Sequence, residues 1–301
     1  MTASADVIII GGGIVGASIA WHLINAGCRN VVILERETQP GTGSTAKSMG
    51  GVRAQFSLPA DIRMSLYSIP LFRDFEKLTG HPSGYRAQGY LFVATSPRHL
   101  EYLQANCRRQ IAEGVRDVRL ISREEIVAMV PDLRSDDILG GSFCSSDGFV
   151  DPHSVLTGFL NRATEQGAQL VRQARVTRID VDGKGVAGVQ TTKGAFASRA
   201  VVNAAGAWAA EVATFAGIQL PVEPLRRMLV PTEPFHRISH SVPMTVDMST
   251  GFHFRPEGLG FLMAWNDPTE TPGFKLNVDG GFIERFSPWR RTGYLCLRRW
   301  K

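Results

Sequence analysis

The most specific pattern in this chain is DVIIIGGGIVGASIAWHLINAGCRNVVILE, residues 6–35. Residues 7–10 form a short β-branched run, which is typical of a buried parallel strand. Glycines that fit G-x-G-x-x-G follow it, then a helical apolar stripe, and then a second apolar run at residues 31–34 that ends at Glu35. The order of strand, glycine turn, helix and strand predicts an α/β fold with a Rossmann-type, dinucleotide-binding unit.

The glycines of the turn have separate roles in such a unit. Gly11 permits the tight turn, Gly13 lets a pyrophosphate approach the backbone, and Gly16 lets the helix pack closely on the strand. The first helical residues, Ile14 and Val15, lie where unpaired N–H groups and the positive end of the helix dipole face the phosphates. We therefore expect this turn to bind a pyrophosphate.

Glu35 lies where a carboxylate accepts hydrogen bonds from the ribose of an adenosine. A carboxylate there also repels a 2′-phosphate, so the pattern favours FAD or NAD over NADP. The alternative is a glycine-rich turn in an unrelated α/β protein. The strand before the turn, the helix after it and the spacing of the acid argue against that alternative.

Length and composition indicate a globular protein of one or two domains, because 301 residues can bury a large core. No apolar run reaches the length of a transmembrane helix, and no signal peptide is expected, because glycines interrupt the apolar N-terminal run. The cysteines are scattered and lack metal-ligand spacing: Cys28, Cys107, Cys144 and Cys296. We therefore expect free thiols, a cytoplasmic location and no metal site.

The net charge of +5 comes from the end of the chain. Residues 287–301 contain five basic residues and no acidic residue, so the rest of the chain sums to zero. A nucleic-acid-binding protein needs a basic face distributed over its body. We therefore expect no nucleic-acid partner.

A polar loop follows Glu35 over residues 36–51. It contains small residues whose backbone N–H groups and hydroxyls are suited to binding a phosphate or a flavin ring: Gly43, Ser44, Thr45, Ser48, Gly50 and Gly51. The alternative is a solvated linker.

The rest of the chain reads as alternating helices and strands. An aromatic strand is expected at residues 85–95, further strands at 169–179, 185–191 and 195–204, and an aromatic hairpin at 252–265. Ser122 and Glu125 form a capping-box pattern before a short helix. Pro70 lies inside a helical pattern over residues 60–79 and predicts a kink or a break there.

Several segments, taken in order, resemble the D-amino-acid-oxidase-like family of FAD-dependent oxidoreductases. They are IIIGGGIVGASIAWHLINAG with VVILE, GSTAKSMGGVRAQF, DGFVDPHSVLTGF, and VVNAAGAWAAEVATFAG followed by PVEPLRR. The resemblance is greatest to the sarcosine oxidase β-subunit and dimethylglycine dehydrogenase. It implies a Rossmann-type FAD-binding domain interleaved with a smaller antiparallel-sheet α+β substrate domain. The expected boundaries are 1–84 and 138–225 for the FAD-binding domain, 85–137 and 226–286 for the substrate domain, and 287–301 for an atypical basic tail.

The same resemblance implies roles for individual residues. Gly43, Ser44 and Thr45 lie along the pyrophosphate and ribityl chain, and the stretch from Ser48 through Gly50 to Gly51 approaches the isoalloxazine. The remaining expected cofactor contacts are Arg36 beside Glu35, Val176 near the adenine, and Ala205 with Gly206 close to the cofactor. Residues 44–51 supply no His, Cys or Tyr for a covalent link, so we expect non-covalent FAD.

Two residues are candidates for the substrate side. Arg53 resembles the arginine that pairs with a substrate carboxylate in sarcosine oxidases, and a guanidinium suits that task because it binds a carboxylate in a bidentate fork. The alternative for Arg53 is a surface ion pair. His253 is expected either to line a substrate pocket or to be a strand histidine with an ordinary partner.

The resemblance implies oxidation of a small amine or amino acid by hydride transfer to the flavin, with oxygen, a quinone or another flavoprotein as electron acceptor. The alternatives are a non-catalytic flavoprotein, such as an assembly factor, and an NAD-dependent dehydrogenase. The expected partners include further subunits of a hetero-oligomer. The relatives continue further, with a glycine-rich segment beside the flavin. We therefore expect a truncation or frameshift at about Phe286 that leaves this form weakly active or inactive; the alternative is a natural basic, aromatic patch for an anionic partner.

Overall fold

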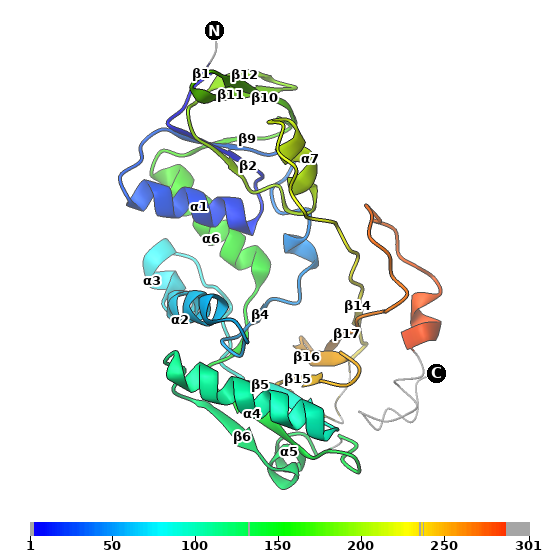
Figure 1. Ribbon diagram of the computed structural model, residues 1–301. Helices are drawn as coiled ribbons and strands as arrows, with labels where there is room; N and C mark the ends of the chain where they lie inside the picture. The colour runs from blue at the N-terminus through cyan, green and yellow to red at the C-terminus, as the bar shows by residue number, and fades with distance from the viewer. Residues whose placement is uncertain (1–2, 132, 235, 237, 287–301) are drawn as a thin grey trace.

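The computed structural model describes residues 3–286, except 132, 235 and 237. The tail expected at residues 287–301 lies outside the described residues. The described chain forms two halves, each built around one main sheet, and α2 (Pro59–Arg73) and α3 (Phe75–Thr79) lie between them (Figure 1).

The first half contains a four-stranded parallel sheet. Its order is β13 (Val201–Asn203), β2 (Val7–Ile10), β3 (Val31–Leu34) and β9 (Gln169–Val171). The expected turn and helix connect the two central strands, with α1 at Ile14–Asn25. β2 and β3 are buried over nearly their whole length because both faces of the sheet are covered, as in most parallel sheets.

Alternate side chains of these strands pack on different layers. Ile9 and Ile33 face α1 and α6 (Pro152–Glu165), with α3 (Phe75–Thr79) beyond them. Ile8 and Val32 face a second sheet and α7 (Ala209–Thr214). That sheet contains β1 (Ala3–Ser4), β12 (Gly194–Ala197), β11 (Gly185–Thr191) and β10 (Val176–Asp182). Figure 1 shows the parallel sheet between these two layers.

Two expected strands are wrong in extent. The strand expected at 169–179 is divided into β9 and β10, and that expected at 195–204 into β12 and β13, with each pair split between the two sheets. The first division contains Gln173, the only non-glycine residue with a positive φ (57°) in the described chain. The chain leaves one layer and enters the other at these points, so continuous β-propensity did not reveal the break.

The second half contains a seven-stranded, mainly antiparallel sheet. Its order is β14 (Leu229–Pro231), β17 (Gly260–Ala264), β16 (His253–Glu257), β15 (Met244–Asp247), β5 (Tyr90–Ala94), β7 (Gly140–Cys144) and β6 (Val118–Ile121). β15 and β5 are the one parallel pair in this described sheet. Two helices accompany it, α4 (Pro97–Ala112) and α5 (Arg123–Met129), and α5 begins with the expected capping box.

The placement of β7 differs from the boundary expected at residue 137. We expected residues 138–225 to return to the FAD-binding domain, but β7 pairs with β5 and β6 in the second half. Its sequence, GGSFC, has no clear alternation of apolar and polar residues, so the pattern did not indicate a strand. We propose that this boundary lies after Cys144.

The two halves meet around a short ribbon in which β4 (Gly51–Val52) pairs with β8 (Gly148–Phe149). The chain then enters α2 (Pro59–Arg73), which contains Pro70 and is followed at Asp74 by α3. The break therefore lies just after the proline rather than at it. Tyr90 and Met244 on the second sheet pack against Met49, so one face of that sheet is directed toward the ribbon.

Candidate functional site

A cavity of about 1230 Å³ lies along the carboxyl ends of the parallel strands, where it is bordered by Ile10, Leu34 and Ala204. Open α/β sheets bind ligands at this edge. The volume exceeds the roughly 300–1,000 Å³ of most small-molecule sites, so the cavity has room for a large cofactor.

The glycine turn forms the floor of the cavity. Gly11 has a φ of +115°, and a Cβ there would lie 2.4 Å from the carbonyl oxygen of Ala204. A Cβ on Gly16 would lie 2.0 Å from the carbonyl oxygen of Gly11. A Cβ on Gly13 would meet only the Thr45 hydroxyl, at 3.3 Å. Protein packing therefore requires glycine at 11 and 16, whereas Gly13 leaves open the space that a ligand needs.

The first turn of α1 faces the same space. Gly13 is its N-cap and supplies no side-chain cap. The backbone N–H of Ile14 donates to the Thr45 hydroxyl at 3.1 Å, and the side chain of Val15 is 60% exposed at the cavity wall. Thr45 therefore holds the loop of residues 36–51 against the helix terminus as well as lining the cavity.

Glu35 is nearly buried, and both of its carboxylate oxygens are held by backbone N–H groups. Oε2 accepts from Gly12 at 2.9 Å and Oε1 from Glu37 at 2.8 Å. Each carboxylate oxygen has a further lone pair, so these bonds fix the carboxylate and still leave acceptors for hydroxyl groups.

Replacing Glu35 by alanine is expected to weaken FAD binding by about 1–3 kcal/mol, because ribose hydroxyls lose their acceptors and the Gly12 and Glu37 N–H groups lose theirs. The measurement is FAD retention by equilibrium dialysis, followed by flavin release on denaturation. The matched control is Glu101→Ala, an exposed acid on α4. Equal FAD retention by the Glu35 variant and this control would contradict the expected role.

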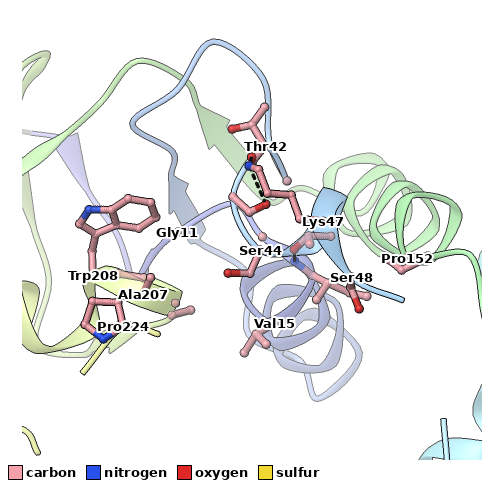
Figure 2. Close-up of a pocket in the computed structure, with 18 of the residues that line it drawn as sticks. Gly11, Val15, Thr42, Ser44, Lys47, Ser48, Pro152, Ala207, Trp208 and Pro224 are labelled. Atoms are coloured by element: carbon pink, nitrogen blue, oxygen red, sulfur yellow. Dashed lines mark hydrogen bonds between the residues drawn. The ribbon is translucent and has the colours of Figure 1, made fainter. Parts of the chain in front are cut away.

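The opposite wall is aromatic. The guanidinium carbon of Arg36 lies 3.6 Å from the ring centroid of Trp208, and the ring of Phe274 stacks on Trp208 at 5.5 Å. Figure 2 shows Trp208 and Pro224 across the cavity from Ser44 and Ser48. The sequence analysis included Ala205 and Gly206 but missed Trp208, because its ring reaches the cavity only through the turn that follows β13.

Of the predicted site residues, all but Gly16 and His253 line this cavity. They are Gly11, Gly13, Ile14, Val15, Glu35, Arg36, Gly43, Ser44, Thr45, Ser48, Gly50, Gly51, Arg53, Val176, Ala205 and Gly206. Lys47, which was not predicted, also lines it and donates from Nζ to the Thr42 carbonyl at 2.8 Å (Figure 2).

Arg53 lines the cavity beside aromatic rings. Its guanidinium carbon is 4.3 Å from the centroid of Phe56, 5.5 Å from that of Tyr90 and 5.9 Å from that of Phe92. Its Nε is buried without a hydrogen-bond partner, and no ion pair among the described residues involves Arg53. The surface ion pair considered as an alternative is therefore wrong within the described chain.

The pocket role considered for His253 is wrong, because His253 is not among the residues that line this cavity. It lies on β16, and its Nδ1 is 2.9 Å from the carbonyl oxygen of Gly251. Burial lowers its pKa, the hydrogen bond to Gly251 opposes this, and the nearby Arg53 charge lowers the pKa further. The strand histidine with an ordinary partner is the alternative that the structure supports.

Two buried charged residues form hydrogen bonds with segments next to the cavity, and the sequence analysis missed both. Asp147 is fully buried and accepts hydrogen bonds from the segment that follows Arg53. Arg255, on β16, donates from Nε to the Met49 carbonyl at 2.7 Å and lies over the ring of Phe149. Each contact joins residues distant in sequence, so no local pattern indicated it.

Asp147 gives an expected pH dependence of stability. Burial raises its pKa from 3.8 to about 6, hydrogen bonds from Ala54, Gln55 and Cys144 oppose the rise, and the Asp117 charge adds to it. The pKa of Asp147 is higher in the folded state than in the unfolded state, so ionisation of this carboxyl lowers the free energy of unfolding. The loss grows between pH 3.8 and 6 and is constant above pH 6. The free energy of unfolding is measured in urea for wild type and for Asp147→Asn. From pH 4.5 to pH 7, we expect the wild-type value to fall by about 2 kcal/mol relative to that of the variant. A difference independent of pH would contradict the raised pKa.

Comparison with known proteins agrees with this geometry. The family described as FAD dependent oxidoreductase (DAO) matches residues 6–291. Human mitochondrial dimethylglycine dehydrogenase is 31% identical over 288 residues, which cover 94% of this chain and 32% of that protein. Human mitochondrial sarcosine dehydrogenase is 30% identical over 266 residues, which cover 86% and 28%. The chain thus spans about a third of the length of these curated relatives.

A solved structure, L-proline dehydrogenase from P. horikoshii, superposes with a TM-score of 0.90 at 28% identity and covers 99% of this chain and 79% of that chain. None of the helices among the described residues is long and apolar enough to span a bilayer.

The cavity fits the cofactor of that family. It combines an open position at Gly13, the uncapped start of α1 and the fixed carboxylate of Glu35, which suit a pyrophosphate and a ribose. The chain belongs to the DAO family of FAD-dependent oxidoreductases, and its cofactor is FAD.

Proposed function

We propose that this chain is the cofactor-binding and substrate-binding part of an enzyme that oxidises a C–N bond of a small secondary amine or amino acid bearing a carboxylate. The observation that carries the proposal is Arg53, a guanidinium at the cavity wall with a buried, unpartnered Nε and no acidic partner among the described residues. A cation in an apolar environment favours an anionic ligand, and the guanidinium fork matches a carboxylate.

In this proposal, different residues of the cavity bind the cofactor and the substrate. Gly13, the α1 terminus and Glu35 would hold the pyrophosphate and adenosine, and the loop with Ser48 and Gly51 would lie beside the ring system. When bound, FAD supplies the acceptor for a hydride from the carbon next to the amine nitrogen. Arg53 would hold the carboxylate so that this C–H bond has one orientation in the cavity.

The aromatic neighbours of Arg53 support a small substrate. Phe56, Tyr90 and Phe92 lie beside the partly buried guanidinium and lower the local dielectric around it, which strengthens a carboxylate pair. The relatives named for dimethylglycine and sarcosine act on N-methyl amino acids by name, and this is the substrate class that we propose here. A cytoplasmic location and non-covalent binding of FAD stay predictions.

The testing experiment is anaerobic flavin bleaching in FAD-loaded protein across a panel. The panel contains N-methylglycine, N,N-dimethylglycine, proline and glycine, with N-methylglycinamide as an uncharged control. We expect at least one carboxylate-bearing amine to bleach the flavin at least tenfold faster than its amide, because a charge-assisted pair contributes about 1.5–3 kcal/mol. Bleaching by amides alone would refute the substrate class, and a fully loaded protein bleached by no amine would favour the non-catalytic flavoprotein.

A further inference from the structure

Asp147 connects the two halves behind the cavity. Its side chain is 0% exposed, and Oδ1 accepts from the backbone N–H of Ala54 at 2.7 Å. Its Oδ2 accepts from Nε2 of Gln55 at 3.1 Å. An aspartate placed in this way satisfies two donors of the segment that follows Arg53, and both hydrogen bonds are buried.

Gln55 extends this contact into the second sheet. Its Nε2 also donates to the carbonyl oxygen of Tyr90 at 2.9 Å, and its Oε1 accepts from the Ser142 hydroxyl at 2.6 Å. Tyr90 and Ser142 lie on the paired strands β5 and β7. The segment after Arg53 is therefore joined to the sheet that carries two of the rings beside the guanidinium, those of Tyr90 and Phe92.

The residues before Arg53 are held by the same part of the chain. Val52 pairs with Gly148 and Gly51 pairs with Phe149 in the β4–β8 ribbon. Asp147 directly precedes that ribbon, so residues 147–149 contact the backbone on both sides of Arg53. No direct bond between Asp147 and Arg53 is present among the described contacts, and the effect acts through the backbone.

We propose that Asp147 is a positioning residue that sets the direction of the Arg53 guanidinium toward a substrate carboxylate, which rests on the function proposed above. A bidentate pair requires the two groups to be held to within a fraction of an ångström, and a fixed backbone reduces the conformational entropy that the protein loses on binding. The ordinary reading of a buried aspartate, that it only stabilises the fold, does not require its two acceptors to hold the residues next to Arg53.

The test compares Asp147→Asn with Asp247→Asn in the FAD-loaded full chain. Asp247 is also buried, at 2% exposed, and binds Ser249 and Thr250 in a turn after β15, so it controls for the loss of a buried aspartate. The ligands are N-methylglycine and N-methylglycinamide, followed by the change in flavin absorbance. A second variant, Gln55→Ala, removes the partner of Oδ2 and carries the test if Asp147→Asn does not fold.

We expect Asp147→Asn to weaken the affinity for N-methylglycine about tenfold, with the affinity for the amide and the limiting rate of flavin reduction within about twofold to threefold of wild type. Gln55→Ala should act in the same direction, and Asp247→Asn should match wild type. Equal losses for the carboxylate and the amide, or for the Asp147 and Asp247 variants, would overturn the proposal.

A crystal structure of Asp147→Asn gives a readout that needs no ligand. We expect the Arg53 guanidinium to leave its place over Phe56, and a guanidinium that stays within about 0.5 Å of its wild-type position would overturn the proposal. If wild type shows no preference for the carboxylate over the amide, the proposed function is wrong, and this structural comparison alone decides the positioning role.

Discussion

Gly16→Ala is expected to destabilise the folded chain by about 3 kcal/mol and to weaken FAD binding at least tenfold. The added Cβ would lie 2.0 Å from the carbonyl oxygen of Gly11 and 3.3 Å from the side chain of Ile9. The first contact is with backbone, so relief requires α1 to move away from β2. That movement displaces the first turn of α1 from the phosphate position, which couples stability to cofactor binding.

The measurement is thermal unfolding with and without added FAD, together with FAD retention. Gly183→Ala is the matched control, because Gly183 lies in the turn between β10 and β11 with no heavy atom within 4 Å of the built Cβ. We expect the control to match wild type. A Gly16 variant with an unchanged midpoint and full FAD would show that the helix can move at little cost, and the packing argument would be wrong.

Arg53→Lys is expected to weaken the affinity for a carboxylate substrate about tenfold to a hundredfold, with little change for an uncharged amide. Lysine keeps the positive charge but loses the planar fork, so a two-bond contact becomes a single one. The stack on Phe56 is also lost, because an ammonium lacks the flat face of a guanidinium.

Flavin reduction under anaerobic conditions separates affinity from the limiting rate in this test. Arg86→Lys is the control, since Arg86 is exposed and its guanidinium carbon lies 5.9 Å from the ring of Phe149. An Arg53 variant whose apparent dissociation constant equals that of this control would assign Arg53 another role.

The local parts of the fold and of the site could be predicted from the sequence. The turn at Gly11, the spacing to Glu35 and the capping box at Ser122 each depend on residues near one another in sequence, and the structure has all three elements. The positive φ of Gly11 and the reciprocal bonds of the capping box act within one turn of chain, and Glu35 lies at the end of the same strand–helix–strand unit. Such causes leave a pattern in the order of residues.

The supporting residues left no such pattern. Asp147 and Ala54 are 93 residues apart, and Arg255 and Met49 are 206 apart. An aspartate before a glycine is an ordinary turn sequence, and an arginine on a strand is an ordinary exposed residue. Their burial follows from how the two halves meet, which local propensity does not specify. For the same reason the sequence left open whether His253 lines a pocket beside Arg53 or is an ordinary strand histidine, and only Arg53 lines the cavity.

The parallel sheet has a consequence for how the protein is made. β13 pairs with β2, and the Ser198 hydroxyl donates to the Asp6 carbonyl across a separation of 192 residues. The residue against which Gly11 packs, Ala204, is therefore not available until residue 204 has left the ribosome. Closing so long a loop has an entropic cost, and sheets dominated by distant pairings fold slowly. During synthesis the apolar strands around the glycine turn therefore stay uncovered until β13 is available. We expect chaperones and the supply of FAD to affect the yield of folded protein during this interval.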